Sequence, residues 1–234
     1  MSVRKVFKAV VFSIWKPLVR LIRPYSANDK FIANDFGFSR GTPVDRWYIH
    51  QFFLDNAKLI TGSCLEFGEL TYLNKYGSDV TKKVMFNYSN IMQVRSGEIC
   101  GDITIPSQLP EEEFDCIVCV NVLNFIYDIK SALFGLRRML KRNGVIVITV
   151  AGPVAHISRY DMVRWGDFWR FTDRTIAQLV SEAGLKVEEI KTYGNPLSCV
   201  TQINGYSVED IGVDSLLPNH SDYQLVIGLV VRKI

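Results

Sequence analysis

Short apolar runs alternate with helical patterns from residue 42 to residue 232. Strands are predicted at 64–67, 83–88, 114–120, 145–150, 187–193 and 223–232, and a further short strand at 101–103. The run 114–120 is apolar almost throughout, which is typical of a strand buried on both faces. Helices are predicted at 42–59, with Thr42 as N-cap and Pro43 as first residue, and at 129–140 and 172–183. This alternation predicts an α/β protein with a doubly wound, mainly parallel sheet.

Residues 1–23 form a basic amphipathic pattern. Apolar positions recur at helical spacing, and six Lys and Arg residues without any acid give this segment a charge of +6. Pro17 interrupts the helix, and the apolar runs are too short to span a bilayer. No small-residue cleavage site follows, which argues against a signal peptide. The segment either lies on an anionic membrane surface or packs against the domain or a second subunit.

Residues 24–41 are rich in Gly, Asn and Asp and are interpreted as a linker. We therefore predict a helical extension and linker over residues 1–41 and one domain over residues 42–234.

Charge and cysteine content narrow the function classes. The net charge is +3, so the chain after residue 23 carries 3 − 6 = −3, and nucleic acid is not an expected partner. Five cysteines argue for a reducing, cytoplasmic compartment. Cys116 and Cys119 lie three apart on a predicted strand and point to opposite faces, so they are interpreted as buried thiols and not as a redox or zinc pair.

The segment 63–69 suggests a cofactor site. An apolar strand ends at Glu66, two positions before Gly68. Glycine lets the backbone approach a ligand closely, and a carboxylate can accept a hydrogen bond from a ribose hydroxyl or an ammonium group. This order indicates a nucleoside-type cofactor at the carboxyl end of the first strand.

The middle of the chain resembles the class I S-adenosylmethionine-dependent methyltransferases, in particular the methyltransferase type 11 group. The resemblance rests on Gly101-Asp102-Ile103, the strand that begins Phe114-Asp115, the turn Asn143-Gly144, and the segment Trp169–Thr172 with its following helix. It implies a seven-stranded sheet and S-adenosyl-L-methionine as cofactor. The implied cofactor-binding residues are Glu66, Gly68, Glu69, Asn87, Asp102, Ile103, Asn121, Val122 and Leu123.

A closer resemblance is to a subgroup associated with bacterial cell-surface polysaccharide synthesis. It rests on segments 43–49, 159–162 and 165–172. It implies O-methylation of a saccharide or lipid-linked glycan, a glycosyltransferase partner, and a place in the cytoplasm or on the inner face of the membrane. Aromatic faces stack on sugar rings, and Arg binds anionic groups, so Tyr160, Trp165, Trp169 and Arg170 are candidates for acceptor binding, with core packing or internal pairing as the alternative.

Methyl transfer to a hydroxyl requires alignment of the two reactants and removal of a proton. His156, Asp161 and Asp167 are the candidate bases. The two aspartates are alternatively ligands of a divalent metal, which some sugar methyltransferases use, or simple caps. Asp45, Arg46 and Tyr48 on the first helix either close over the cofactor carboxylate or form a solvated face.

Two positions depart from the family pattern. Leu70 stands where members have a second glycine, and Asn87 replaces the usual acid at the end of the second strand. Two other interpretations therefore stay open: a non-catalytic binding or scaffold protein on a degenerate methyltransferase fold, and a small-molecule methyltransferase.

Overall fold

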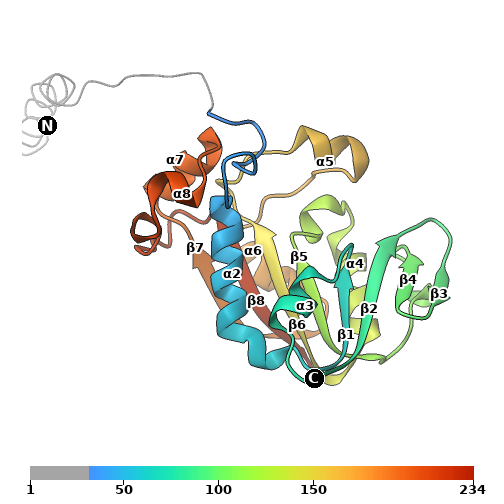
Figure 1. Ribbon diagram of the computed structural model, residues 1–234. Coiled ribbons are helices and arrows are strands. Elements are labelled where there is room, and N and C mark those ends of the chain that lie inside the picture. The colour runs from blue at the N-terminus through green and yellow to red at the C-terminus, as the bar shows by residue number, and fades with distance from the viewer. Residues whose placement is uncertain (1–31) are drawn as a thin grey trace, which may run out of the picture. The chain divides into compact units, whose positions relative to one another are not determined.

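The computed structural model describes residues 32–234, and these form a single sheet covered by helices on both faces (Figure 1). Within them, eight strands pair in the order β3-β4-β2-β1-β5-β6-β8-β7. The strands are β1 Gly62–Phe67, β2 Val80–Tyr88, β3 Gln93–Arg95, β4 Glu98–Gly101, β5 Phe114–Val120, β6 Leu140–Ala151, β7 Leu185–Tyr193 and β8 Val226–Lys233.

The strand directions are those of a doubly wound sheet with one reversed strand. β1 pairs in parallel with β2 and with β5, β2 pairs in parallel with β4, and β5 pairs in parallel with β6. β8 is antiparallel to both of its neighbours, β6 and β7. Seven of the strands match the expected sheet, and the count differs because the short strand β3 adds an antiparallel edge to β4.

Two layers of helices bury the two faces of the sheet. The helices are α2 Val44–Asn56, α3 Thr71–Tyr76, α4 Ile129–Met139, α5 Arg159–Arg164, α6 Asp173–Glu182, α7 Pro196–Asn204 and α8 Val208–Ile211. Buried side chains of α4 and α6 belong to one core cluster, and those of α2, α3 and α7 belong to the other. Because β5 lies between these two cores, its apolar run is buried on both faces, as predicted.

The start of α2 differs from the prediction. The helix begins at Val44 and makes no side-chain cap bond. The predicted cap, Thr42, is used elsewhere: its hydroxyl donates to Oε1 of Glu209 at 2.8 Å, and its backbone N–H donates to Oε2 of the same residue. A contact with a residue far along the chain has replaced a local one, which sequence spacing alone does not show.

Residues 32–41 belong to the compact unit although the sequence suggested a linker. They contain no helix or strand, but their backbone is tied to the end of α7 by the Ile32 N–H, which donates to the Asn204 carbonyl at 2.8 Å. The amphipathic segment predicted over residues 1–23 lies outside the described residues. Within residues 32–234, no helix is both long enough and apolar enough to cross a membrane.

Candidate active site

Two adjoining cavities lie at the carboxyl ends of the parallel strands. The larger has a volume of about 860 Å³ and the smaller about 180 Å³. Val120, Asn121, Phe125 and Asp161 line both of them, so the cavities form one continuous cleft. Parallel α/β sheets bind ligands at this edge, which makes the cleft the candidate active site.

Gly68 forms the turn that opens the larger cavity. Its φ of +77° lies in the left-handed region that favours glycine. A Cβ atom built on Gly68 meets nothing within 4 Å, so the space above this residue is open. The Gly68 N–H donates to the Phe86 carbonyl at 2.9 Å, which ties the turn to the end of β2. The predicted close approach of backbone and ligand is therefore sterically available here.

Glu66 supports this turn from below and does not line the cavity. Its side chain is buried, and its two oxygens accept hydrogen bonds from the Tyr72 and Leu73 backbone N–H groups at 2.9 and 2.8 Å. These are free donors of the first turn of α3. Burial raises the pKa of Glu66 to about 7, although the two hydrogen bonds act in the opposite direction. The expected direct cofactor contact is thus replaced by a bond that fixes the start of α3.

Leu70 does not occupy the larger cavity. Its side chain packs against the core cluster beneath α2 and α3. The departure from the second glycine therefore takes no space from the larger cavity.

Most of the predicted cofactor-binding residues meet in the larger cavity. Its lining includes Gly68, Glu69, Asn87, Asp102, Ile103, Asn121 and Val122. Leu123 is an exception, as Glu66 is, because it is fully buried in the core beneath α4. The sequence could not distinguish it from Val122, since side chains in a one-turn helix point to different sides within one residue.

The larger cavity offers polar groups without protein partners. Asp102 accepts both the N–H and the hydroxyl of Thr104 on its Oδ1, at 2.8 and 2.7 Å, and its Oδ2 has no partner among the described residues. Asn87 donates its amide to Glu98 at 2.8 Å, which leaves its carbonyl oxygen as an acceptor. Acceptors of this kind suit the amino and hydroxyl groups of a nucleoside, and 860 Å³ is within the usual range for a ligand of that size. The residues present therefore fit S-adenosylmethionine.

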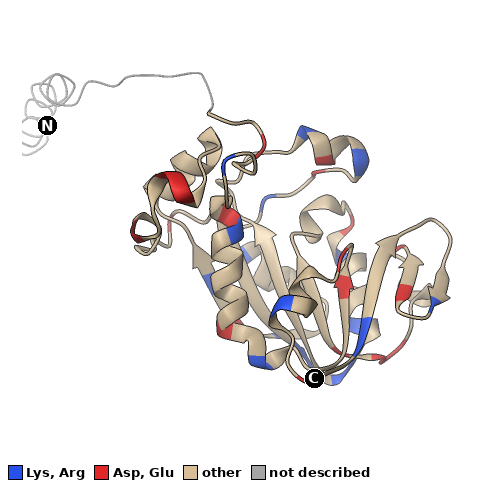
Figure 2. Cartoon of the chain, in the orientation of Figure 1, with Lys and Arg blue, Asp and Glu red and all other residues tan. Residues whose placement is uncertain are grey.

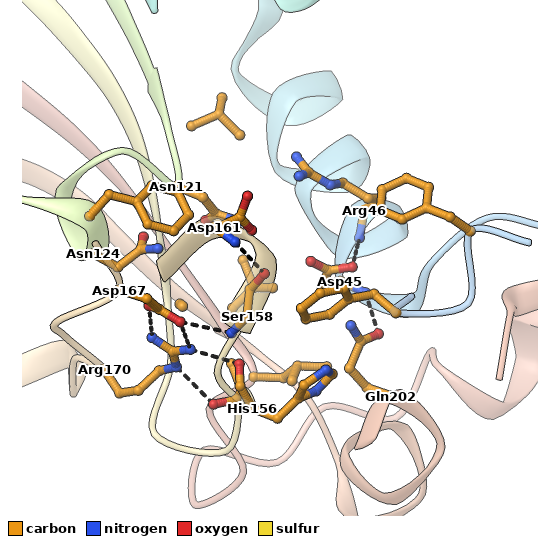
Figure 3. Close-up of a pocket in the computed structure, with 18 residues that line it drawn as sticks. Asp45, Arg46, Asn121, Asn124, His156, Ser158, Asp161, Asp167, Arg170 and Gln202 are labelled. Atoms are coloured by element: carbon orange, nitrogen blue, oxygen red, sulfur yellow. Dashed lines mark hydrogen bonds and ion pairs between the residues drawn. The ribbon is translucent and has the colours of Figure 1, made fainter. Parts of the chain in front are cut away.

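The smaller cavity contains two buried polar atoms without partners (Figure 3). Nδ1 of His156 and Oδ1 of Asn124 are inaccessible and make no hydrogen bond within residues 32–234. The His156 ring stacks on Phe36, with ring centroids 4.2 Å apart. Burial lowers the pKa of His156, and the nearby Asp45 carboxylate opposes this effect without reversing it. The imidazole is therefore neutral at pH 7 and can accept a proton.

Asp167 and Arg170 line the smaller cavity but are committed to each other. Arg170 donates from Nη1 and Nη2 to the two oxygens of Asp167 at 2.6 and 2.9 Å, and its Nη2 and Nε also donate to the His156 and Ala155 carbonyls. Asp167 Oδ2 accepts the Ser158 N–H as well. Burial opposes ionisation, but these bonds hold the pKa of Asp167 below its ordinary value. We therefore assign the pair a positioning role, in place of the base and the acceptor clamp that the sequence suggested.

Asp161 remains available as a polar group of the cleft. It lines both cavities, and its carboxylate makes no hydrogen bond or ion pair within the described part of the chain. Its position follows from Ser158, which caps α5 by accepting the Asp161 N–H at 3.1 Å.

Only one of the three predicted acceptor aromatics reaches a cavity. Trp165 lines the larger one, whereas Tyr160 and Trp169 line neither. Tyr160 lies on the outside of α5 with the Arg164 guanidinium over its ring, and the Trp169 indole donates to the Ile126 and Tyr127 carbonyls. Sequence spacing does not predict where these side chains point, because α5 is only six residues long and Trp169 follows it in a loop.

Several cavity residues were not predicted as part of the acceptor region. The smaller cavity is also lined by Phe36, Phe38, Asn124 and Gln202. Phe36 and Phe38 come from the segment interpreted as a linker, and Gln202 comes from α7, which the sequence analysis did not identify. Only Asn124 carried a signal, since it follows β5 in the same loop as Asn121.

Arg46 on α2 is a cation that faces this end of the cleft. Its Nη1 donates to the Tyr72 hydroxyl at 3.2 Å, and it forms no ion pair within 4.0 Å in residues 32–234. It lines the smaller cavity beside Asp45, whose backbone N–H donates to Gln202. This placement leaves the guanidinium free to bind a carboxylate that reaches the smaller cavity.

No group of three or more His, Cys, Asp and Glu side chains that could hold a metal ion occurs in residues 32–234. The cysteines 116 and 119 are fully buried free thiols, in agreement with the interpretation from the sequence.

Comparisons with known proteins agree with this geometry. Residues 59–148 match the family described as "Methyltransferase domain". No curated protein matches the chain. A SAM-dependent methyltransferase from Thermotoga maritima superposes with a TM-score of 0.53 at 17% identity, over 84% of this chain and 95% of that one.

Two further solved structures share the fold. An S-adenosylmethionine-dependent methyltransferase from Mesorhizobium loti has a TM-score of 0.51 at 11% identity, over 81% of this chain and 98% of that one. The cyclase SpnF has a TM-score of 0.52 at 14% identity, over 93% of this chain and 92% of that one. Residues 59–148 are therefore similar to the methyltransferase domain family, and the described part of the chain has the fold of these S-adenosylmethionine-dependent methyltransferases.

Proposed function

We propose that this protein uses S-adenosyl-L-methionine to methylate a hydroxyl group of a saccharide or lipid-linked glycan. The observation that carries the proposal is the pair of unpartnered buried atoms, Nδ1 of His156 and Oδ1 of Asn124, in a small cavity that opens into the cofactor-sized one. Unpaired buried polar atoms are costly, and both residues line the smaller cavity, so a turn of either side chain would bring its unpaired atom to a hydroxyl group bound there. A hydroxyl acceptor therefore satisfies what the protein itself leaves unsatisfied.

The larger cavity holds the cofactor in this proposal. Asp102 and Asn87 would supply acceptors for the nucleoside, the Gly68 turn would allow the close approach, and Arg46, which lines the adjoining smaller cavity, would bind the cofactor carboxylate. When bound, S-adenosylmethionine supplies a methyl carbon that its sulfonium has already activated. The protein then contributes alignment and proton removal.

His156 is the base in this proposal. Its imidazole is neutral at pH 7 and can take the proton of the acceptor hydroxyl. Arg170 fixes the loop by donating to the carbonyl of His156 itself, and Phe36 fixes the ring by stacking. Asp161, at the junction of the cavities, accepts a hydrogen bond from a neighbouring hydroxyl of the acceptor.

The sequence resemblance supports the choice of a saccharide and places the reaction in cell-surface polysaccharide synthesis, beside a glycosyltransferase. The basic, amphipathic pattern of residues 1–23 supports a location on the cytoplasmic face of an anionic membrane. Both statements are part of the proposal.

Transfer of a labelled methyl group tests the proposal. The purified protein is incubated with S-adenosylmethionine labelled in its methyl group and with a panel of free and lipid-linked saccharides, beside a panel of small phenols and amines. We expect label in an alkali-stable methyl ether of a saccharide. Label that appears only in the phenols or amines would favour the small-molecule alternative, and no transfer to any acceptor would favour the non-catalytic one.

A further inference from the structure

Three large side chains of α5 and its C-cap are exposed to solvent, and only one of them, Trp165, also lines the cleft. Val163 is 86% exposed, Tyr160 67% and Trp165 57%. Asp161 and Met162, on the inner side of the same helix, are half-buried. α5 thus turns its acid toward the cleft and exposes Tyr160 and Val163 to solvent beside its two arginines.

A second group of exposed aromatic side chains adjoins α5. Tyr127 is 72% exposed, Phe168 52% and Trp169 37%. Tyr127 contacts the other two rings, with centroid distances of 5.5 Å to Phe168 and 5.9 Å to Trp169. Tyr127 and Trp165 both line the larger cavity, so the two groups flank the same opening. We call the six side chains together the α5 rim.

Two exposed arginines without a carboxylate partner in the described part of the chain lie beside the α5 rim, together with one exposed acid, Asp128, next to Tyr127. Arg159 and Arg164 are exposed, and blue segments mark both ends of α5 in Figure 2. Arg159 contacts only the Met162 sulfur, at 3.2 Å, and Arg164 donates to the Tyr160 carbonyl at 2.8 Å. Neither forms an ion pair with a carboxylate in residues 32–234. The acidic residue of α5, Asp161, faces the cleft and does not offset them at the outer surface.

This chemistry fits the interface of an anionic bilayer. Trp and Tyr favour the level of the lipid headgroups, Arg pairs with lipid phosphates, and a tip residue such as Val163 enters the acyl boundary. Isolated exposed apolar residues are ordinary, but six of them beside two unpaired cations at the mouth of a cleft are not.

We propose that the α5 rim docks on an anionic lipid surface and presents the mouth of the cleft to it. The docking itself needs only the rim. If the acceptor is a lipid-linked glycan, docking also brings the cleft to its substrate, and this consequence rests on the function proposed above.

The loop that carries α5 is already fixed for this purpose. Asp167 accepts the Ser158 N–H. Arg170 donates to the Ala155 and His156 carbonyls. These bonds join the segment before α5 to the segment after it. Docking therefore requires no rearrangement of the base of the loop, and His156 keeps its place.

Vesicle co-sedimentation of the full chain tests the proposal. Vesicles of phosphatidylcholine alone are compared with vesicles that also contain phosphatidylglycerol. We expect Val163→Asp to weaken partition onto the mixed vesicles about fivefold or more, because it puts a charge where the tip meets the acyl boundary. Val200→Asp is the matched control: Val200 is also exposed, at 58%, but lies on α7 away from the rim, and its substitution should change nothing.

The cationic contribution is tested in the same assay. Arg159→Gln should weaken binding to the mixed vesicles about fivefold, since one basic residue near an anionic surface contributes about 1 kcal/mol, and should leave binding to phosphatidylcholine unchanged. Arg174→Gln, at an exposed arginine on α6, is the control and should behave as wild type.

Three results would overturn docking by the α5 rim. The first is a wild-type chain that ignores both vesicle types. The second is a Val163→Asp chain that binds as well as the Val200→Asp control, which would mean that another segment does the binding. The third is a Val163→Asp chain that also loses methyl transfer to a water-soluble saccharide, which would make the rim part of the working cleft. If the wild-type chain binds vesicles through the rim but methylates no saccharide, the docking proposal stands and the proposed function fails.

Discussion

The two halves of the cleft are built in different ways. The larger cavity is assembled from the ends of β1, β2, β4 and β5 and the turns that follow them, within residues 67–128, apart from the three residues that α5 and its end contribute. The smaller cavity draws on residues 36–46, the loop after β6, and Gln202 of α7, which are far apart in the sequence. Topology alone fixes the first half, whereas the second depends on side-chain contacts between distant segments. We therefore expect substitutions in the smaller cavity to separate catalysis from cofactor binding.

The largest expected effect comes from His156. His156→Gln should lower kcat for the best saccharide acceptor by about 100-fold or more, the usual contribution of a general base, while the affinity for S-adenosylhomocysteine stays the same. The wild-type rate should also fall at acidic pH with a midpoint below 6.5, because the pKa of His156 lies below that value, and the variant should lack this limb. His220→Gln, at an exposed histidine, is the control. A variant that keeps its rate and its pH profile would remove His156 from the mechanism.

The next effect concerns the stability of the loop that supports the smaller cavity. The Asp167 side chain is 1% exposed, so Arg170→Met leaves a buried carboxylate without its cation and should cost about 3 kcal/mol or more in the free energy of unfolding. Arg232→Met removes an ion pair with Glu188 whose two side chains are each 30% exposed, and should cost about 1 kcal/mol or less. Urea unfolding measures both values. Equal costs would contradict the assignment of Asp167 and Arg170 as the fixed base of the loop.

A third prediction concerns Glu66 beneath the larger cavity. Folding raises the pKa of Glu66 from 4.5 to about 7. Between pH 4.5 and pH 7, the carboxyl group therefore keeps its proton in the folded state but has released it in the unfolded chain. The contribution of this group to stability is therefore largest below pH 4.5 and declines as the pH rises to about 7, by up to about 3 kcal/mol. Glu66→Gln should lack this decline. Urea unfolding gives the free energy of unfolding of both proteins at each pH. If the wild type and Glu66→Gln differ by the same amount at acidic and at neutral pH, Glu66 ionises normally.

The smallest effect separates backbone strain from ligand contact. Gly68 and Gly212 share a φ of +77°, and a Cβ on either meets nothing within 4 Å. Alanine at either position should therefore cost about 1 kcal/mol of stability, through the left-handed backbone alone. Only Gly68→Ala places its methyl group in the larger cavity, so only this variant should also weaken S-adenosylhomocysteine binding. Equal affinities for the ligand would mean that the Gly68 turn does not approach the cofactor.

Sequence reasoning located the larger cavity because its residues follow strand ends. Gly68 and Asn121 each come directly after a predicted strand, Asp102 lies where the short third strand was expected to end, and the carboxyl ends of parallel strands share one edge. It could not tell a supporting residue from a lining one. Glu66 and Leu123 occupy the predicted segments, but burial turns their side chains into the protein.

The smaller cavity was largely outside the reach of the sequence. His156 and Asp161 were identified from their place after β6, but no local pattern brings Phe36 or Gln202 to them. The aromatic residues near α5 were noticed as unusual, and the structure shows why: Tyr160 and Trp169 lie outside the cleft, on a rim that sequence proximity could not distinguish from its interior.

The most direct test of the cleft is calorimetric titration with S-adenosylhomocysteine. The wild-type chain should give saturable heat with one site, and Val122→Trp, which fills the larger cavity, should abolish it. Val200→Trp, on the exposed face of α7, should bind as wild type. If folded wild-type protein gives no heat at about millimolar ligand, a concentration at which even weak sites are occupied, the larger cavity is not a cofactor site and the account is wrong.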